Sequence, residues 1–391
     1  AELVKAGVAP SAIEAASARA VFRCLRVWGI SPAGAVALKD AAVRGGGGAA
    51  APAPSEHAAA VDMLLFGTLD DYRRILAALH PQMENEELRS CAEQIKSVLM
   101  NVEGSVPPRA CEWNGRALRW GEKTFVMGII NTTPDSFYSF SRKEGPESAA
   151  ETARAMLEAG ADILDIGGES SRPGAEPVST EEECSRVAPA IKAIRAEFPD
   201  AVISIDTYRA ATAAAAIEAG ADIINDISAL SADPDMARVA AEAGAPVCLM
   251  HMQGTPRNMQ KDPKYEKDVC GEIIAFLAHR AGFAVEAGIS PGRIIIDPGI
   301  GFGKTVANNL EILNRLGEFR TLGLPILIGA SRKSFIGLTL DLPEEDRLEG
   351  SLAAASIAIA SGADVLRVHD VIETVRAARI ADAIVRRTRG I

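Results

Sequence analysis

Polar side chains able to bind a polar ring, hold an anion or balance charge recur through the last two thirds of this 391-residue sequence. Each follows a short apolar run closely. In MGIINTTPDSF (127–137), for example, the apolar run ends at Asn131 and small hydrogen-bonding residues follow. The same pattern recurs at Asp165 with Glu169, Asp206, Asn225 with Asp226, His251, Asp297, Lys333, and Arg367 with His369.

Asp206, Asn225 and Asp297 form a set rich in hydrogen-bond acceptors, with one amide that both donates and accepts. A flat heterocycle carrying a 2-amino group, a ring N–H and a carbonyl would satisfy such a set. Its burial would leave few polar groups unpaired. The sequence therefore indicates a site for a small heterocyclic ligand.

Arg367 and His369 occupy alternate residues of the last apolar run, so in a strand they point to the same face. A guanidinium and an imidazole side by side indicate an anion clamp. Lys333, in GASRKSFIG after the preceding run, could add positive charge at either end of the ligand.

The elements that must position these residues are eight strand-length apolar runs that alternate with helical patterns. Several of the helical patterns end in AGA or SGA, where Gly suits a left-handed helix cap. Strict alternation over about 265 residues predicts a parallel sheet closed into a (β/α)8 TIM barrel, with its active site at the carboxyl ends of the strands. The runs are FVMGII (125–130), DILDIG (162–167), VISID (202–206), DIINDI (222–227), VCLMH (247–251), IIIDPG (294–299), ILIGA (326–330) and DVLRVH (364–369).

The sequence changes character near residue 120, which predicts a small N-terminal α/β domain at 1–120 and the barrel at 121–391. In the first part, GGGGAAAPAP (45–54) is typical of a flexible loop, and VDMLLFGTLDDYRRILAAL predicts a strand followed by an amphipathic helix. No motif there carries chemistry, so we interpret this domain as a packing or oligomerisation module.

Composition excludes several classes of partner. The net charge is −11 and no block of Lys or Arg suggests a nucleic-acid surface. The six Cys residues are scattered without metal-ligand spacing, which fits a reducing cytoplasm. We expect neither a membrane span nor a signal peptide.

The segment PGIGFGKT (298–305) looks like a phosphate-binding loop at first sight. The GxxxxGK[ST] pattern, however, requires Gly where Pro298 stands, and the spacing from Gly299 to Gly303 is one residue short. We reject a nucleotide triphosphatase, and expect these glycines to let the backbone turn tightly beside Asp297.

Taken together, eight motifs resemble dihydropteroate synthase, the pterin-binding barrel enzyme of folate synthesis. The resemblance covers roughly residues 123 to 387, in order, and leaves the first 120 residues outside it. The motifs are MGIINTTPDSF, DIGGESSRPGAEPVS, SIDT, INDI, LMHMQGTP, IIIDPGIGFGK, GASRKSFIG and RVHDV.

The resemblance implies a role for each matching residue. The pterin ring would be held by Asp206, Asn225, Asp297 and Lys333, with Met250 in the pocket wall. The pyrophosphate of 6-hydroxymethyl-7,8-dihydropterin diphosphate would be held by Asn131, Arg367 and His369, with Asn131 also approaching Mg²⁺. The p-aminobenzoate pocket would be formed by Phe137, Ser171, Arg172, Pro173 and Lys333. A homodimer and sensitivity to sulfonamides are also implied.

The implied chemistry begins with cleavage of the bond to pyrophosphate, which leaves a cation on the pterin methylene. Asp206 suits stabilisation of that cation, and Arg367, His369 and Mg²⁺ suit the leaving group. The arylamine of p-aminobenzoate then attacks, positioned by two loops that also exclude water. Ser171 stands where many members have Thr, which keeps the hydroxyl, and the first loop is longer than usual.

Two alternatives remain open. A methyltetrahydrofolate-corrinoid methyltransferase shares the pterin barrel, but it needs neither a diphosphate clamp nor a benzoate pocket, so SSRPG, SRKSFIG and RVH argue against it. A non-catalytic pterin-binding protein would not need the anion clamp and the metal ligand together.

Overall fold

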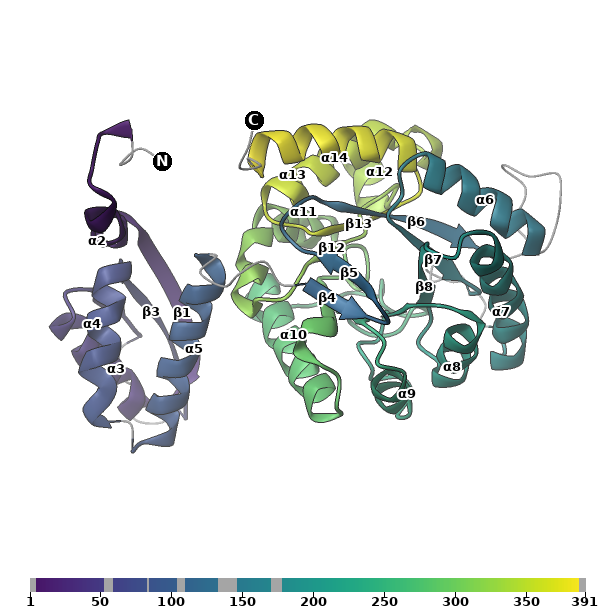
Figure 1. The fold of residues 1–391 in the computed structure, drawn as a ribbon. Coiled ribbons are helices and arrows are strands. Elements are labelled where there is room, and N and C mark those ends of the chain that lie inside the picture. The colour runs from purple at the N-terminus through teal and green to yellow at the C-terminus, as the bar shows by residue number, and fades with distance from the viewer. Residues whose placement is uncertain are drawn as a thin grey trace. The chain divides into compact units, whose positions relative to one another are not determined.

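The computed structural model describes residues 5–52, 59–82, 84–103, 110–132, 146–169 and 178–386. The chain forms two compact units, Ala1–Val106 and Pro107–Ile391 (Figure 1). The sequence placed a domain boundary near residue 120, whereas the units divide between residues 106 and 107.

The first unit is a three-stranded antiparallel sheet, in the order β1-β3-β2, with helices packed against it. Its core contains fully buried Leu65 from the sheet and Tyr72 and Ile75 from a helix. The elements are α2 (Pro10–Ala20), β1 (Phe22–Ile30), α3 (Pro32–Arg44), β2 (Gly48–Ala50), β3 (Val61–Thr68), α4 (Leu69–Leu79), the 3₁₀ helix η1 (His80–Gln82) and α5 (Glu86–Val102).

The prediction of a strand followed by an amphipathic helix is confirmed by β3 and α4. Thr68 begins the helix with a capping box, because its hydroxyl accepts from the Asp71 amide while the Asp71 carboxylate accepts from the Thr68 amide. The prediction of a flexible loop at 45–54 is wrong at β2, which pairs with β3. Gly48 lies opposite Phe66, whose ring occupies the space that a side chain at Gly48 would need.

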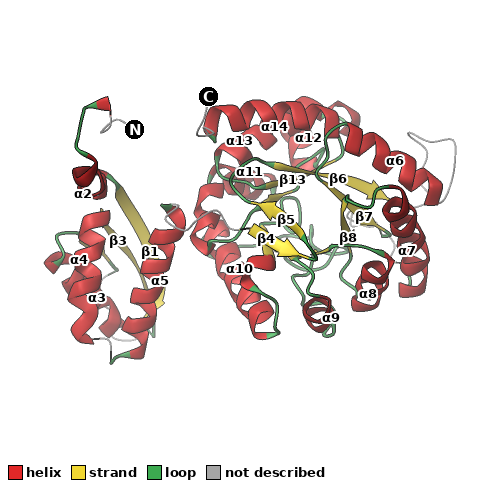
Figure 2. Cartoon of the chain, in the orientation of Figure 1, coloured by secondary structure: helices red, strands yellow, loops and turns green. Residues whose placement is uncertain are grey.

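The second unit contains an eight-stranded parallel sheet in the order β11-β10-β9-β8-β7-β6-β13-β12. A parallel bridge between Ile296 and Ile326 joins its two ends, so the sheet closes into the predicted barrel (Figure 2). The strands are β6 (Phe125–Asn131), β7 (Ile163–Gly167), β8 (Val202–Asp206), β9 (Ile223–Asp226), β10 (Val247–Met250), β11 (Ile294–Asp297), β12 (Leu327–Ile328) and β13 (Val365–Val368).

Helices surround the barrel strands. The predicted glycine caps are confirmed at Gly220 and Gly244, which end α8 and α9 in the left-handed conformation. The α-helices are α6 (Pro146–Glu158), α7 (Thr180–Glu197), α8 (Ala210–Ala219), α9 (Met236–Ala243), α10 (Val269–Glu286), α11 (Val306–Asn314), α12 (Ser334–Leu340), α13 (Leu348–Ala360) and α14 (Val371–Val385), and the 3₁₀ helices are η3 (Pro291–Arg293), η4 (Leu316–Leu322) and η5 (Glu344–Asp346). In the described ranges, every helix is too short or too polar to cross a membrane.

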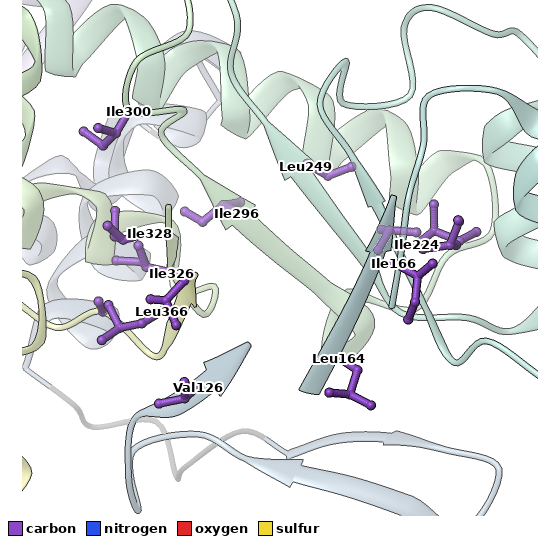
Figure 3. Packing of buried hydrophobic residues seen from close by; sticks show 14 of the residues in the cluster. Val126, Leu164, Ile166, Ile224, Leu249, Ile296, Ile300, Ile326, Ile328 and Leu366 are labelled. Atoms are coloured by element: carbon purple, nitrogen blue, oxygen red, sulfur yellow. The ribbon is translucent and has the colours of Figure 1, made fainter. Parts of the chain in front are cut away.

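Alternation along each strand separates two apolar layers. Side chains that point outward pack against the helices, among them Val126, Leu164, Ile224 and Leu366 (Figure 3). Side chains one residue away point into the barrel instead.

The amino-terminal end of the barrel is closed by a hairpin of two strands, β4 (Ala110–Trp113) and β5 (Arg116–Arg119). Trp113 and Leu118 of the hairpin pack against the first inward residues of the barrel strands, such as Met127 and Ile163. Trp113 is 2% exposed, and its Nε1 donates to Asp222 at 3.2 Å. The hairpin therefore forms the floor of the barrel.

Candidate functional site

A pocket of about 380 Å³ opens at the carboxyl ends of the strands. It brings together six of the residues that the sequence singled out, whereas Asn225, Met250 and Asp297 are not among its lining residues. The six are Asn131, Glu169, Asp206, Lys333, Arg367 and His369, and Ile129, Met259, Gly301, Phe302, Ser331, Arg332, Ser334, Glu344 and Arg347 also line the pocket.

The two-residue period of the strands explains why these side chains converge. Along β13, Val365 joins the apolar floor, and Arg367 and His369 follow at successive inward positions. Along β6, Met127 joins the floor and Asn131 lies in the pocket four residues later. These two strands thus carry apolar residues at the bottom and polar residues at the mouth.

Arg367 joins two carboxylates from other strands of the barrel. Its Nε donates to Oδ2 of Asp165 and its Nη2 to Oδ2 of Asp206, both at 2.6 Å. Asn225 donates from Nδ2 to the same Asp165 oxygen at 3.2 Å. Asp165 is fully buried and connects the predicted clamp to the predicted ring-binding residues.

Asp206 and Asp297 are acids whose environment opposes ionisation. Burial raises the pKa of Asp206 to about 7, although Arg367 pulls it down. Burial also raises the pKa of Asp297, and the positive charge of Lys333 opposes that shift. Asp297 accepts from the Gly299 amide at 2.7 Å, which holds its carboxylate at the end of β11.

Lys333 begins α12 and extends across the site. Its Nζ donates to the carbonyl of Ile300 and lies 4.5 Å from the centre of the Phe302 ring. Burial lowers the pKa of Lys333 to about 8, although Asp297 raises it. The negative charge of Asp297 therefore favours the ammonium form of Lys333 against the cost of burial.

His369 and Asn131 lie at the mouth of the barrel. Nδ1 of His369 lies 3.1 Å from the hydroxyl oxygen of Ser331. The main-chain amide of His369 also donates to that oxygen. Asn131, Gly167 and Asp206 are successive partners across three strands. A Cβ built on Gly167 would lie 3.7 Å from both Asn131 Oδ1 and Asp206 Oδ2, so there is room for about one carbon atom beside these two oxygens.

Met250 and Asp226 are each the last residue of a strand, but their side chains have different surroundings. Met250 pairs with Asp297 across β10 and β11 and is buried. Asp226 turns out of the barrel, because its carboxylate accepts from the amides of Ser228 and Leu230 and so caps the turn after β9. Its strand-end position therefore does not make it part of the site.

The predicted residues of the two loops, Phe137, Ser171, Arg172 and Pro173, lie outside the described residues. Arg209 contacts the described residues on either side of the second loop, Glu169 before it and Val178 after it. This side chain pairs with Glu169 at 2.6 Å and donates to the carbonyl of Val178 at 3.0 Å.

Sequence reasoning gave no role to several pocket residues from the region after β12. Arg332 forms two hydrogen bonds with Asp370, at 2.8 and 2.7 Å, and Arg347 donates to the Arg332 carbonyl at 3.0 Å. Glu344 and Arg347 lie in a connection between helices rather than at a strand end. A search limited to residues at strand ends therefore misses Glu344 and Arg347. Ser331 and Ser334 belong to the same motif as Lys333, GASRKSFIG.

Comparison with known proteins gives a consistent assignment. Residues 127–369 match the family model of pterin binding enzymes. The chain is 50% identical over 268 residues to dihydropteroate synthase of Clostridium beijerinckii, across 68% of this chain and 96% of that protein.

Two solved structures resemble the barrel unit. Dihydropteroate synthase of Yersinia pestis, solved with a sulfonamide drug, has a TM-score of 0.66 and 44% identity over 70% of this chain and 98% of that chain. The Xanthomonas albilineans enzyme, solved with 4-aminobenzoic acid, has a TM-score of 0.65 and 42% identity over 71% and 98%. The chain therefore belongs to the dihydropteroate synthases, transferases of folate biosynthesis within the family of pterin-binding enzymes.

Proposed function

We propose that this chain joins 6-hydroxymethyl-7,8-dihydropterin diphosphate to p-aminobenzoate, giving 7,8-dihydropteroate and pyrophosphate. The observation that carries the proposal is the ion-paired group of Arg367, Asp165 and Asp206 beside Lys333 and Asp297. Asp206, Lys333 and Arg367 of this group line one pocket, which therefore offers an acceptor for a heterocycle and cations for a leaving group. The 4-aminobenzoic acid bound to the Xanthomonas relative supports the choice of amine.

The pterin ring is assigned to the acids and the amide inside the barrel. Asp297 and Asp206 accept hydrogen bonds from the amino and ring N–H groups, and Asn225 offers its oxygen because its Nδ2 is bonded to Asp165. Lys333 donates to the ring carbonyl region, and Met250 forms part of the wall. Because the two acids are buried, the site favours a ligand that donates hydrogen bonds to them.

The diphosphate is assigned to Arg367, His369 and Asn131 at the mouth. As the C–O bond to pyrophosphate breaks, negative charge grows on the leaving oxygen and positive charge on the pterin methylene. Arg367 and His369 stabilise the leaving group, and the Asp206 carboxylate lies on the side of the cation. The amine nitrogen then forms the new C–N bond and loses its proton to solvent.

Mg²⁺ fits the donor set at Asn131. Among the described residues, no three His, Cys, Asp or Glu side chains form a metal cage. Mg²⁺, however, commonly binds through one or two protein oxygens together with substrate phosphates and water. Asn131 lines the pocket with its oxygen beside Gly167, so it would hold the ion, which neutralises charge on the diphosphate when bound.

The p-aminobenzoate pocket is assigned to Lys333 together with Phe137, Ser171, Arg172 and Pro173. The sulfonamide bound to the Yersinia relative supports a drug-sensitive pocket in this chain as well. We also propose that the chain acts in the cytoplasm as a homodimer. The chemistry is assigned to residues 121–391, and none to residues 1–120.

The test is an assay with purified protein, dihydropterin diphosphate, Mg²⁺ and labelled p-aminobenzoate. Pyrophosphate and labelled dihydropteroate should appear in equal amounts. Lys333→Ala should reduce turnover by more than about tenfold, whereas Lys264→Ala, a change at an exposed lysine, should not. Pterin binding without either product would contradict the proposal and favour a non-catalytic pterin-binding protein.

A further inference from the structure

Lys304 is a buried lysine at the end of the glycine-rich loop after β11, and the mechanism above gives it no role. The residue is 3% exposed. Its Nζ lies 3.0 Å from His251 Nδ1, 3.3 Å from the His251 carbonyl oxygen and 3.0 Å from the Phe302 carbonyl oxygen. Three acceptors around one nitrogen match the three N–H groups of an ammonium.

His251 is held as a neutral acceptor. Burial, with the nearby charge of Lys304, lowers the pKa of His251 to about 3. A neutral imidazole that accepts at Nδ1 carries its proton on Nε2. The ring packs edge-on against Phe276, with their centres 4.9 Å apart, which fixes its orientation.

The contact joins the loops that follow β10 and β11. His251 donates its main-chain amide to the Asp297 carbonyl at 2.9 Å, directly at the strand ends. A Cβ on Gly299 would meet the His251 carbonyl oxygen at 1.9 Å, so the two backbones touch where only glycine fits. Gln260 and Tyr265 of the first loop also donate to the carbonyls of Gly301 and Gly303.

The loop after β11 carries much of the proposed pterin site. Asp297 precedes it, and the Ile300 carbonyl within it accepts from Lys333. The Phe302 ring also lies beside the Lys333 ammonium. An ammonium buried among neutral acceptors is costly compared with an apolar side chain of similar volume, so folding alone does not explain Lys304.

We propose that Lys304 is a positioning residue of the pterin site, which holds the loops after β10 and β11 together and so fixes Asp297 and the acceptor of Lys333. This inference rests on the pterin-binding roles proposed for Asp297 and Lys333.

The charge of Lys304 responds to pH near neutrality. Burial lowers its pKa to about 7, Asp297 on β11 raises it and Lys333 after β12 lowers it. As the pH rises above neutral, the Lys304 side chain therefore loses a proton, and with it the positive charge and one of its three N–H donors.

The first test compares Lys304→Met with Lys261→Met, a change at an exposed lysine of the loop after β10. The dissociation constant of 6-hydroxymethylpterin, which lacks the diphosphate, is measured by calorimetry. Lys304→Met should weaken binding about tenfold and raise the KM for dihydropterin diphosphate more than it lowers kcat. Lys261→Met should match the wild type.

The second test is the pH dependence of that effect. The ratio of dissociation constants, Lys304→Met over wild type, should be largest near about pH 6 and smaller near about pH 8.5, because the wild type loses the same charge. Removal of the Lys304 charge also changes the electrostatic environment of Asp297 and Lys333, so the ratio reports the charge of Lys304 together with its effect on these two neighbours. A ratio that is constant with pH would mean that the charge has no role in positioning.

The third test changes the partner and keeps the lysine. His251→Gln retains an acceptor for Nζ and should keep most of the pterin affinity. His251→Phe retains a ring against Phe276 but no acceptor, and should weaken binding as Lys304→Met does. The double variant Lys304→Met with His251→Phe should cost no more than either single change.

Several results would overturn the inference. Unchanged pterin affinity in folded Lys304→Met would do so, as would strictly additive effects in the double variant. If Lys304→Met fails to fold, the comparison of His251→Gln with His251→Phe decides. A Lys333→Ala variant with normal pterin affinity would instead contradict the proposed site itself.

Discussion

Arg367 and Asp165 belong to strands that are not neighbours, since β6 lies between β13 and β7, yet Nε and Oδ2 are 2.6 Å apart. The same guanidinium reaches Asp206 on β8, one strand further along. A planar fork of donors therefore links three strands at the level of the pocket. This link couples the proposed pyrophosphate site to the proposed pterin site.

Replacement of Arg367 by Lys should reduce turnover by more than about tenfold, because one ammonium cannot reproduce the two directed hydrogen bonds. Arg367→Ala should be at least as severe and should lower the melting temperature, since it leaves two acids without their cation. Turnover is measured with labelled p-aminobenzoate, with Arg379→Lys on α14 as the control. Near-normal turnover in Arg367→Lys would show that the fork geometry is unimportant.

The pH dependence of kcat/KM should form a bell. Burial raises the pKa of Asp206 to about 7, so activity that needs its carboxylate falls as the pH drops below about 7. Burial lowers the pKa of Lys333 to about 8, so activity that needs its ammonium falls as the pH rises above about 8. Initial rates at low substrate across this range test both limbs. A flat profile through neutrality would contradict these two assignments.

Removal of Mg²⁺ should separate diphosphate binding from ring binding. EDTA should abolish turnover and weaken binding of dihydropterin diphosphate, because Asn131 would lose the ion that it shares with the phosphates. Binding of 6-hydroxymethylpterin should not change, since its proposed contacts are with Asp206, Asn225, Asp297 and Lys333 rather than with the ion. Turnover that persists in EDTA would remove the ion from the proposal.

Trp113→Ala should destabilise the barrel without changing the chemistry. The indole is 2% exposed in the floor and donates to Asp222, so its removal should cost about 3–5 kcal/mol of unfolding free energy. Urea unfolding measures the loss, and Trp28→Ala, at a residue 38% exposed in the first unit, is the control. The KM values of folded protein should stay near the wild type, because the floor lies at the opposite end from the pocket.

The barrel could be predicted because two local signals agreed along its whole length. Apolar runs of strand length alternated with helical patterns, and Gly stood where α8 and α9 end. The convergence of Asn131, Asp206, Lys333, Arg367 and His369 then followed from the rule that barrel strands carry their site at one end.

Contacts between distant segments could not be predicted in the same way. Nothing in the sequence pairs Arg367 with Asp165, which is 202 residues away, and Asp226 looked equivalent to Asn225 until its side chain was seen to cap a turn. The strand β2 has only small side chains, so its pairing with β3 left no hydrophobic pattern. Four of the p-aminobenzoate residues, Phe137, Ser171, Arg172 and Pro173, lie outside the described part of the chain, and their roles stay predictions.

The floor formed by β4 and β5 has a kinetic consequence. Because the barrel is closed beneath the site, both reactants have to enter, and both products have to leave, through one mouth. Asn225 and Asp297 are buried, at 4% and 6% exposed, whereas Glu344, which lines the pocket, is exposed. If the pterin takes the inner position and p-aminobenzoate the outer one, as proposed above, the pterin has to arrive first. We therefore expect ordered binding, with the amine second.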